Sequence, residues 1–156
     1  MMYSHMNDRE FLKSAIRQSI QSVEEGHFPA GAIVVQNGEI IASGVSDMYP
    51  GYQHAECKAI DNAFLNKGVL NGAALYASME PCLMCLTRAY WSGIRKIVYA
   101  ISKDTLNQSY YEGLESTSKV VKSFNETIEY IHISDIEVEA LKVVRAWEEI
   151  KTSLQT

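Results

Sequence analysis

The stretch SMEPCLMC, residues 78–85, places two cysteines three residues apart, directly after a proline. Proline is favoured at the first position of a helix, so Pro81 predicts that a helix begins here and continues to about Trp91. Side chains at i and i+3 lie on one face of a helix, which brings the sulfurs of Cys82 and Cys85 together. The positive end of the helix dipole lowers the pKa of a thiol in the first turn, so both cysteines favour the metal-binding thiolate form.

A further residue of metal-binding type lies upstream, in HAE at residues 54–56. His54 joins Cys82 and Cys85 as a three-ligand set for Zn²⁺, and the open fourth position that distinguishes catalytic from structural zinc is left for water. Glu56 is not needed as a ligand, and we expect it to act as general base and then general acid. Because residues two apart lie roughly 200° apart around a helix, His54 and Glu56 can share a site only at the helix entrance.

Cys57 leaves a second interpretation of these ligands open. It stands three residues after His54 and is available to complete a structural Cys₃His zinc site in a binding module. That alternative gives Glu56 and Pro81 no role, and a redox-active C-x-x-C pair gives none to His54. Our default expectation is therefore that Cys57 is a small buried helix residue, and the discriminating observation is whether zinc is held without it.

The composition is that of a soluble globular protein with one domain over residues 1–156. Hydrophobic residues make up 47% of the chain and charged residues 21%, as in ordinary globular proteins. No apolar run approaches the roughly 20 residues that span a bilayer, and the N-terminus lacks the pattern of a signal peptide, so we expect a cytoplasmic protein without a membrane partner. The net charge of −5 counts against binding nucleic acid, and three cysteines argue against a disulfide framework.

Hydrophobic periodicity predicts an α/β chain around the two motifs. A first helix is expected from Asn7 or Asp8 to about Glu25, and Asn37-Gly38 is a strong hairpin signal between two β-branched runs. The other elements are expected as strands at 74–77, 97–100 and 128–133, helices at 54–66 and 82–91, a poorly patterned segment at 102–125, and a last helix capped by Asp135. This order predicts a three-layer α/β/α fold with a central five-stranded mixed sheet covered on both faces.

These motifs resemble the cytidine and deoxycytidylate deaminase superfamily, and within it the bacterial guanine deaminase branch. The residues that carry the resemblance are HAE at 54–56, EPCLMCL at 80–86, YW at 90–91, VYA at 98–100, PAGA at 29–32 and RAW at 145–147. The first two form the H-x-E…P-C-x-x-C signature of zinc nucleobase deaminases. The resemblance implies the cytidine deaminase-like fold, one Zn²⁺ per subunit, a small-molecule nucleobase or nucleoside substrate, and a homodimer with active sites near the interface.

The chain departs from the family pattern at three places where the base is recognised. GVS at 44–46 replaces G-x-N, GYQ at 51–53 replaces D-P-T-A, and YEG at 111–113 corresponds to the guanine branch's F-D-D, which supplies a further acid. The candidate substrate-binding residues are Phe28, Ser46, Ala55, Trp91 and Glu112. For Tyr90 and Trp91 we expect core packing first, with a stacking wall for a heterocycle or a subunit contact as the alternatives.

The expected reaction is release of ammonia from an aminated base, guanine-type before pyrimidine. A tRNA adenosine deaminase is the runner-up, but it needs phosphate contacts that an acidic chain is poorly suited to make. The segment ISKDT at 101–105 also lacks that branch's D-x-K-x-G-A. Cytosine and aminotriazines stay open as substrates.

Overall fold

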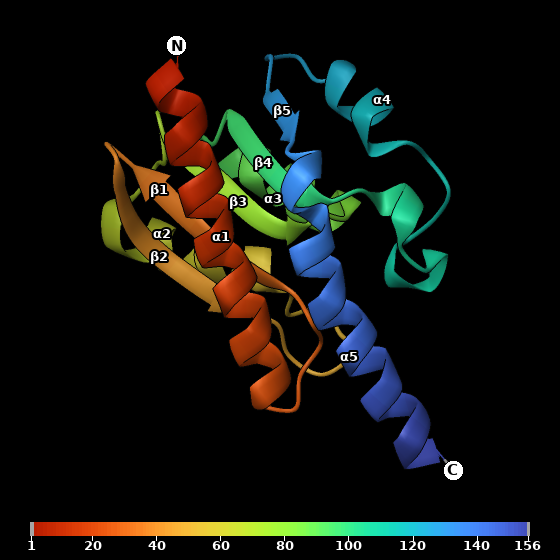
Figure 1. Ribbon diagram of the computed structural model, residues 1–156. Helices are drawn as coiled ribbons and strands as arrows, with labels where there is room; N and C mark the ends of the chain where they lie inside the picture. Colours follow the sequence, from red (N-terminus) through yellow and green to blue (C-terminus); the bar gives the residue numbers. More distant parts are fainter. Residues whose placement is uncertain (1, 156) are drawn as a thin grey trace.

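A five-stranded sheet lies at the centre of the computed structural model, which describes residues 2–155 and the side chains of residues 7–154 (Figure 1). The strands are β1 (Gly31–Gln36), β2 (Glu39–Val45), β3 (Ala74–Met79), β4 (Lys96–Ile101) and β5 (Glu129–His132). Their spatial order is β2-β1-β3-β4-β5. The pairs β2/β1 and β1/β3 are antiparallel, whereas β3, β4 and β5 run parallel. The predicted five-stranded mixed sheet is confirmed.

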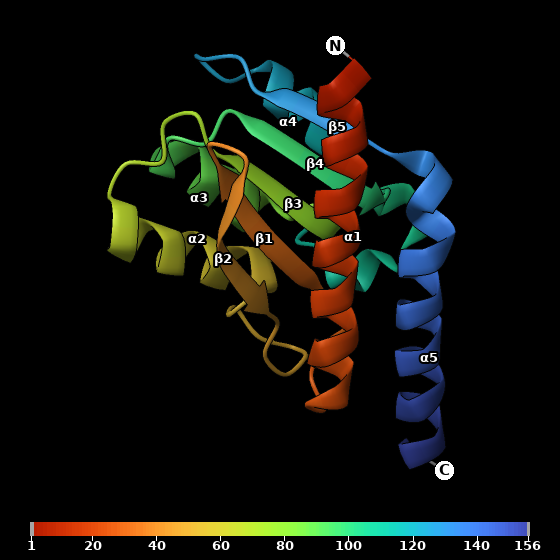
Figure 2. The ribbon, with the colours of Figure 1, turned by 60° about the vertical axis from the view of Figure 1, so that its left-hand side comes forward.

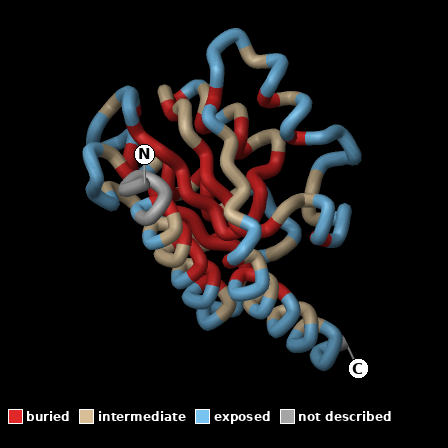
Figure 3. The backbone as a smooth tube through the Cα atoms, turned by 45° about the horizontal axis from the view of Figure 1, so that its top comes forward, coloured by how far each residue is buried: buried red, intermediate tan, exposed pale blue. Residues whose placement is uncertain are grey.

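Helices cover both faces of this sheet, as the rotated view shows (Figure 2). One face carries α1 (Met2–Glu24) and α5 (Glu137–Gln155), and the other carries α2 (Ala55–Lys67) and α3 (Leu83–Ser92). The poorly patterned segment contains the short helix α4 (Thr117–Lys122) and the 3₁₀ turns η1 (Lys103–Thr105) and η2 (Gln108–Tyr110). The buried backbone follows the sheet (Figure 3), and β3 is buried along its whole length. Within residues 2–155, no helix has the length and apolarity that crossing a membrane requires.

The turn between β1 and β2 follows its sequence signal. Asn37 and Gly38 both have positive φ, at 54° and 77°, as a type I′ turn requires of its two central residues. This tight turn sets the antiparallel pairing of β1 with β2.

The expected start of the first helix, at Asn7 or Asp8, is wrong. The Asp8 carboxylate binds residues of the sheet and does not cap the helix. The helix begins at Met2 and continues past Asp8, whose buried carboxylate accepts a hydrogen bond from the Tyr76 hydroxyl at 2.5 Å. The same oxygen lies 3.0 Å from the ammonium nitrogen of Lys96. A buried carboxylate needs such partners, and here they come from the sheet rather than from a helix end.

The last helix also starts later than expected. Residues Ser134–Ile136 form the 3₁₀ turn η3, and α5 begins at Glu137. Asp135 pairs with Arg9 of α1 instead of capping α5. Arg9 is remote from Asp135 in the sequence, so the local pattern could not predict this pairing.

Gly44 lets β2 pass close to the start of α2. A Cβ atom at this position would lie 2.3 Å from the carbonyl oxygen of Ala55 and 2.8 Å from the backbone nitrogen of Ala59. Any larger residue would push α2 away from the sheet, so Gly44 helps to place the helix start that carries His54.

Candidate metal centre and active site

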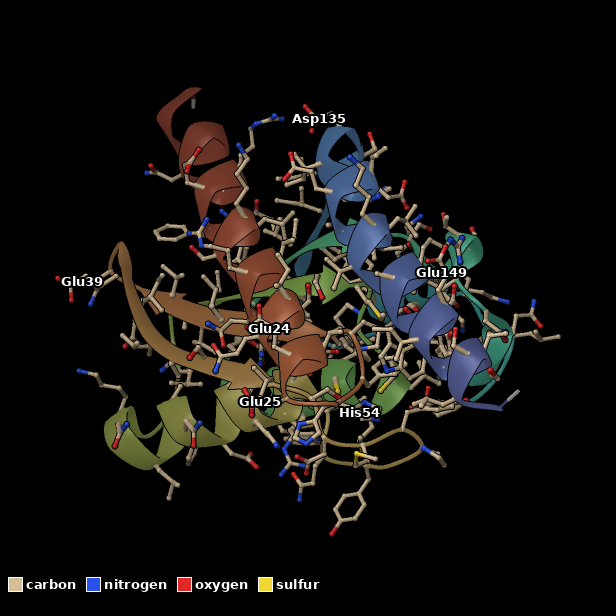
Figure 4. All side chains as sticks on the ribbon, turned by 60° about the horizontal axis from the view of Figure 1, so that its bottom comes forward. Glu24, Glu25, Glu39, His54, Asp135 and Glu149 are labelled. Carbon is tan, nitrogen blue, oxygen red and sulfur yellow. The ribbon has the colours of Figure 1, made fainter. Side chains whose placement is uncertain are left out.

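Both halves of the predicted zinc motif stand at helix starts. His54 is the cap residue of α2 with extended backbone (φ −79°, ψ 156°), and Cys82 is the cap residue of α3 (φ −71°, ψ 171°). The requirement that His54 precede the regular helix is therefore met, and Figure 4 shows His54 at the loop that enters α2. Pro81 lies two residues before the first residue of α3 rather than at that position, because the extended Cys82 delays the helix to Leu83.

The ligand cluster, which we define as His54, Cys82 and Cys85, has the spacing of a zinc site. The Nδ1 atom of His54 lies 3.4 Å from the Cys82 sulfur and 3.5 Å from the Cys85 sulfur, and all three ligand atoms lie within 4.8 Å of one another. Zinc–nitrogen and zinc–sulfur bonds at tetrahedral angles place such atoms about 3.6 Å apart. The donor set and its geometry thus fit Zn²⁺ bound by three protein atoms.

A backbone carbonyl orients the imidazole of His54. The Nε2–H group donates a hydrogen bond to the carbonyl oxygen of Gly51 at 2.9 Å. In the neutral ring this leaves the lone pair on Nδ1, the atom that faces the two sulfurs. Such outer contacts select the tautomer of metal-binding histidines.

Cys57 packs behind the ligand cluster. Its sulfur lies 3.4 Å from that of Cys85, yet among the described residues it does not join the mutually close set of His54, Cys82 and Cys85. The expectation that Cys57 is a small buried helix residue is confirmed by its burial within α2.

Without metal, the ligand cluster holds protons on His54 and Cys85 but not on Cys82 at neutral pH. A hydrogen bond with Cys82 raises the pKa of His54 to about 9, against the opposing effect of burial. A hydrogen bond with Cys85 and the contact with His54 lower the pKa of Cys82 to about 6, although burial works against them. Hydrogen bonds with the Cys57 and Cys82 sulfurs, together with burial, raise the pKa of Cys85 well above its ordinary value. Metal binding must therefore displace the protons of His54 and Cys85.

Glu56 lies beside the cluster with only 5% of its surface exposed. Burial raises the pKa of its carboxyl group to about 7, and the nearby charge of Cys82 adds to the effect. A carboxyl group with a pKa near neutrality can both accept and donate a proton at physiological pH.

A cavity of about 320 Å³ opens over His54, Glu56 and Cys82. Its aromatic wall, defined here as Phe28, Tyr49, Tyr110 and Tyr111, comes from three separate loops. Phe28 stacks on Tyr49 with ring centroids 5.3 Å apart, and Tyr110 and Trp147 of α5 meet it edge-on at 5.1 and 5.2 Å. Among the described lining residues there is no lysine or arginine. The aromatic wall therefore suits a flat ring, and the described lining offers no lysine or arginine to pair with a phosphate.

Only three of the five candidate substrate-binding residues line the cavity. Phe28, Ser46 and Glu112 line the cavity, whereas Ala55 is completely buried in the first turn of α2 and is not among the lining residues. Trp91 is 83% exposed and also does not line the cavity. The expectation that Trp91 packs in the core is wrong, because it lies on the outer side of α3.

The carboxylate of Glu112 is engaged at the start of α3. It accepts hydrogen bonds from the backbone N–H groups of Leu83 at 3.2 Å and Met84 at 3.1 Å. Burial acts to raise the pKa of Glu112, but hydrogen bonds from backbone N–H groups outweigh it and the pKa is lowered. Glu112 is therefore ionised at neutral pH and faces the helix beside Cys82.

Tyr111 falls in YEG at 111–113, a segment that the sequence marks for base recognition, but none of the wall tyrosines was among the five candidate residues. Tyr49 and Tyr111 lie in loops and Tyr110 ends the short 3₁₀ turn η2, so no helix or strand period marks a face. The available signal was a concentration of aromatic residues in segments otherwise rich in polar and turn residues.

Residues 5–101 match the family model described as the cytidine and deoxycytidylate deaminase zinc-binding region. The chain belongs to this family. The matched range contains His54, Glu56, Cys82 and Cys85, and the predicted superfamily is thereby confirmed.

Family relatives differ in the base on which they act. A probable cytosine deaminase of Schizosaccharomyces pombe is 36% identical over 102 residues, covering 64% of this chain and 63% of its own length. A tRNA-specific adenosine deaminase of Aquifex aeolicus is 38% identical over 100 residues, covering 61% and 66%. The structure of guanine deaminase from Bacillus subtilis has a TM-score of 0.60 and 29% identity, covering 90% of this chain and 93% of that one. Membership in the family therefore leaves the substrate to be argued from the cavity.

Proposed function

We propose that the protein is a zinc-dependent hydrolytic deaminase of a small aminated nucleobase, guanine-type before pyrimidine. One juxtaposition carries the proposal: a buried carboxyl group, Glu56, lines the same apolar cavity as two members of a ligand cluster that fits Zn²⁺. A homodimeric state belongs to the same proposal on the strength of the family resemblance, and a cytoplasmic location on the strength of the sequence pattern.

The chemistry divides between the ligand cluster and Glu56. His54, Cys82 and Cys85 would hold Zn²⁺, whose Lewis acidity would lower the pKa of water from about 15.7 to about 7. Glu56 accepts the proton that the attacking water loses and delivers it to a ring nitrogen of the base. It then accepts the second proton from the hydroxyl group added to the ring carbon and donates it to the departing amine. Water and the aminated base thus become a ring carbonyl and ammonia. The Gly51 carbonyl keeps His54 oriented throughout.

The cavity favours a free base or nucleoside over a nucleic acid. Its volume of about 320 Å³ is at the lower end for small-molecule sites. Aromatic side chains in its wall offer faces and edges against which a heterocycle can pack. Recognition of an anticodon loop requires cationic contacts to phosphates, and the described lining residues supply none.

An ammonia-release panel tests this proposal. The zinc-loaded protein is assayed with guanine, guanosine, adenine, cytosine, cytidine, aminotriazines and a tRNA anticodon stem-loop, with Glu56→Gln protein as the blank. We expect turnover of a free base, with guanine first. Activity on the stem-loop alone would overturn the choice of substrate, and the absence of ammonia from every compound would argue against a deaminase.

A further inference from the structure

Glu112, which is distant from α3 in the sequence, accepts hydrogen bonds from backbone N–H groups at the start of that helix. Its two carboxylate oxygens accept the backbone N–H groups of Leu83 and Met84, one each. These belong to the first residues of α3, whose N–H groups have no partner within a helix. The cap residue Cys82 makes no side-chain capping hydrogen bond. Glu112 therefore takes the place of the serine or aspartate that commonly caps a helix.

Glu112 is itself held by its neighbour Tyr111. The Tyr111 hydroxyl donates a hydrogen bond to the backbone carbonyl of Glu80 at 2.7 Å, and the ammonium of Lys103 lies 5.1 Å from the centre of the Tyr111 ring. The backbone N–H of Lys103 in turn donates to the Glu80 carboxylate at 2.8 Å. Glu80 stands two residues before Cys82. These hydrogen bonds therefore connect the loop that contains Glu112 to the segment that precedes the first cysteine ligand.

The separation of the two sulfurs depends on this first turn. Cys82 precedes α3 in extended backbone, and Cys85 is the third residue of the helix. Leu83 and Met84 are the only residues between them, and both donate their N–H groups to Glu112. Helix ends fray where their N–H groups lack partners, so removing the carboxylate frees the backbone that sets the distance between the ligands.

We infer that Glu112 is a positioning residue, which holds the first turn of α3 and thereby keeps the Cys82 and Cys85 sulfurs arranged for Zn²⁺. The inference rests on the proposed zinc function and deepens it. It also gives Glu112 a different role from the proton-transferring acid that the resemblance to F-D-D suggested. Each carboxylate oxygen already accepts one backbone N–H group, so the observed contacts of Glu112 are those of a helix cap.

Comparison of Glu112→Ala with Glu112→Gln separates the two roles. Zn²⁺ affinity is measured by competition with a chromophoric chelator, and Co²⁺ is added separately to read thiolate coordination from its charge-transfer absorption. Glu112→Ala should weaken Zn²⁺ binding by about 10- to 100-fold, the usual effect of losing an outer contact to a metal site. Glu112→Gln keeps one oxygen for one N–H group, so it should lose only about two- to fivefold, the scale of a lost charge–dipole interaction.

A matched control is Glu115→Ala, which removes a glutamate of the same segment whose carboxylate lies 3.6 Å from Lys119. This variant should bind metal as the parent protein does. Metal affinity of Glu112→Ala equal to the parent's would overturn the inference. So would an equal loss of turnover in the Ala and Gln variants at unchanged metal affinity, since that result identifies a proton carrier.

The Gln variant keeps the test decisive if Glu112→Ala does not fold. Turnover of Glu112→Gln within about fivefold of the parent supports positioning, whereas a loss of about 10²-fold or more with normal metal binding overturns it. The metal titrations need no substrate, so a failed ammonia panel would leave them valid. Failure of the parent protein to bind metal would instead refute the proposed zinc function.

Discussion

The ligand cluster and the aromatic wall meet at one cavity but are built in different ways. His54, Cys82 and Cys85 come from two short motifs at the starts of adjacent helices, and their mutual hydrogen bonds shift the pKa of each of them. The wall comes from loops and stays neutral, because burial raises the pKa of Tyr110 and Tyr111 even further. We therefore propose that the two helix starts carry the chemistry and that the wall recognises the base.

Replacing Glu56 should produce the largest effect, which we expect on turnover and not on zinc binding. Glu56→Gln keeps the shape of the side chain but cannot accept a proton, so turnover should fall by at least about 10²-fold. Zinc content, measured by metal analysis, should stay at one per chain because Glu56 is not a ligand. Near-normal turnover in this variant would refute the assigned role.

The pH dependence of metal binding should be the next largest effect. At pH 8 the metal-free protein carries protons on His54, whose pKa is about 9, and on Cys85, whose pKa is raised further, while Cys82 is ionised. Zinc binding should therefore release about two protons, and affinity should rise by about 100-fold per pH unit. Calorimetry in two buffers of different ionisation enthalpy counts these protons, and release of fewer than one would contradict the charge states described.

A substitution in the aromatic wall should raise the KM for the base and leave zinc affinity unchanged. Phe28→Leu retains apolar volume but removes the ring, so KM for the preferred base should rise by about 10-fold, at the upper end of an aromatic contact's contribution. The same substitution at Phe11, whose ring packs 5.3 Å from that of Tyr76, is the matched control and should leave KM unchanged. A change in zinc affinity with Phe28→Leu would mean that wall and cluster are not separable.

The smallest effect is expected at Cys57, where the alternative of a structural zinc is tested. Cys57→Ala should retain zinc with affinity within about threefold of the parent, since catalytic sites use three protein ligands. Metal analysis after dialysis provides the measurement. Loss of zinc would show that the sulfur 3.4 Å from Cys85 is a fourth ligand and would favour a structural module over a deaminase.

Local pattern predicted most of the fold and the metal-binding half of the site. The hairpin at Asn37-Gly38 and the starts of the two motif helices follow from backbone preferences within a few residues. The helix starts expected at Asp8 and Asp135 were wrong. The Asp8 carboxylate binds Tyr76 and the Asp135 carboxylate binds Arg9, both far away in the sequence. Local preference decides such positions only where no tertiary contact competes.

By itself the sequence determined the ligand cluster and Glu56, because their spacing in two motifs is set by the geometry of a helix entrance. Only the tertiary structure decided that Glu112 meets the backbone of Leu83 and Met84, that Phe28 joins Tyr110 in one wall, and that Trp91 lies outside. The physical reason is that helix geometry relates residues three or four apart, whereas contacts between loops depend on how the whole sheet and its helices pack.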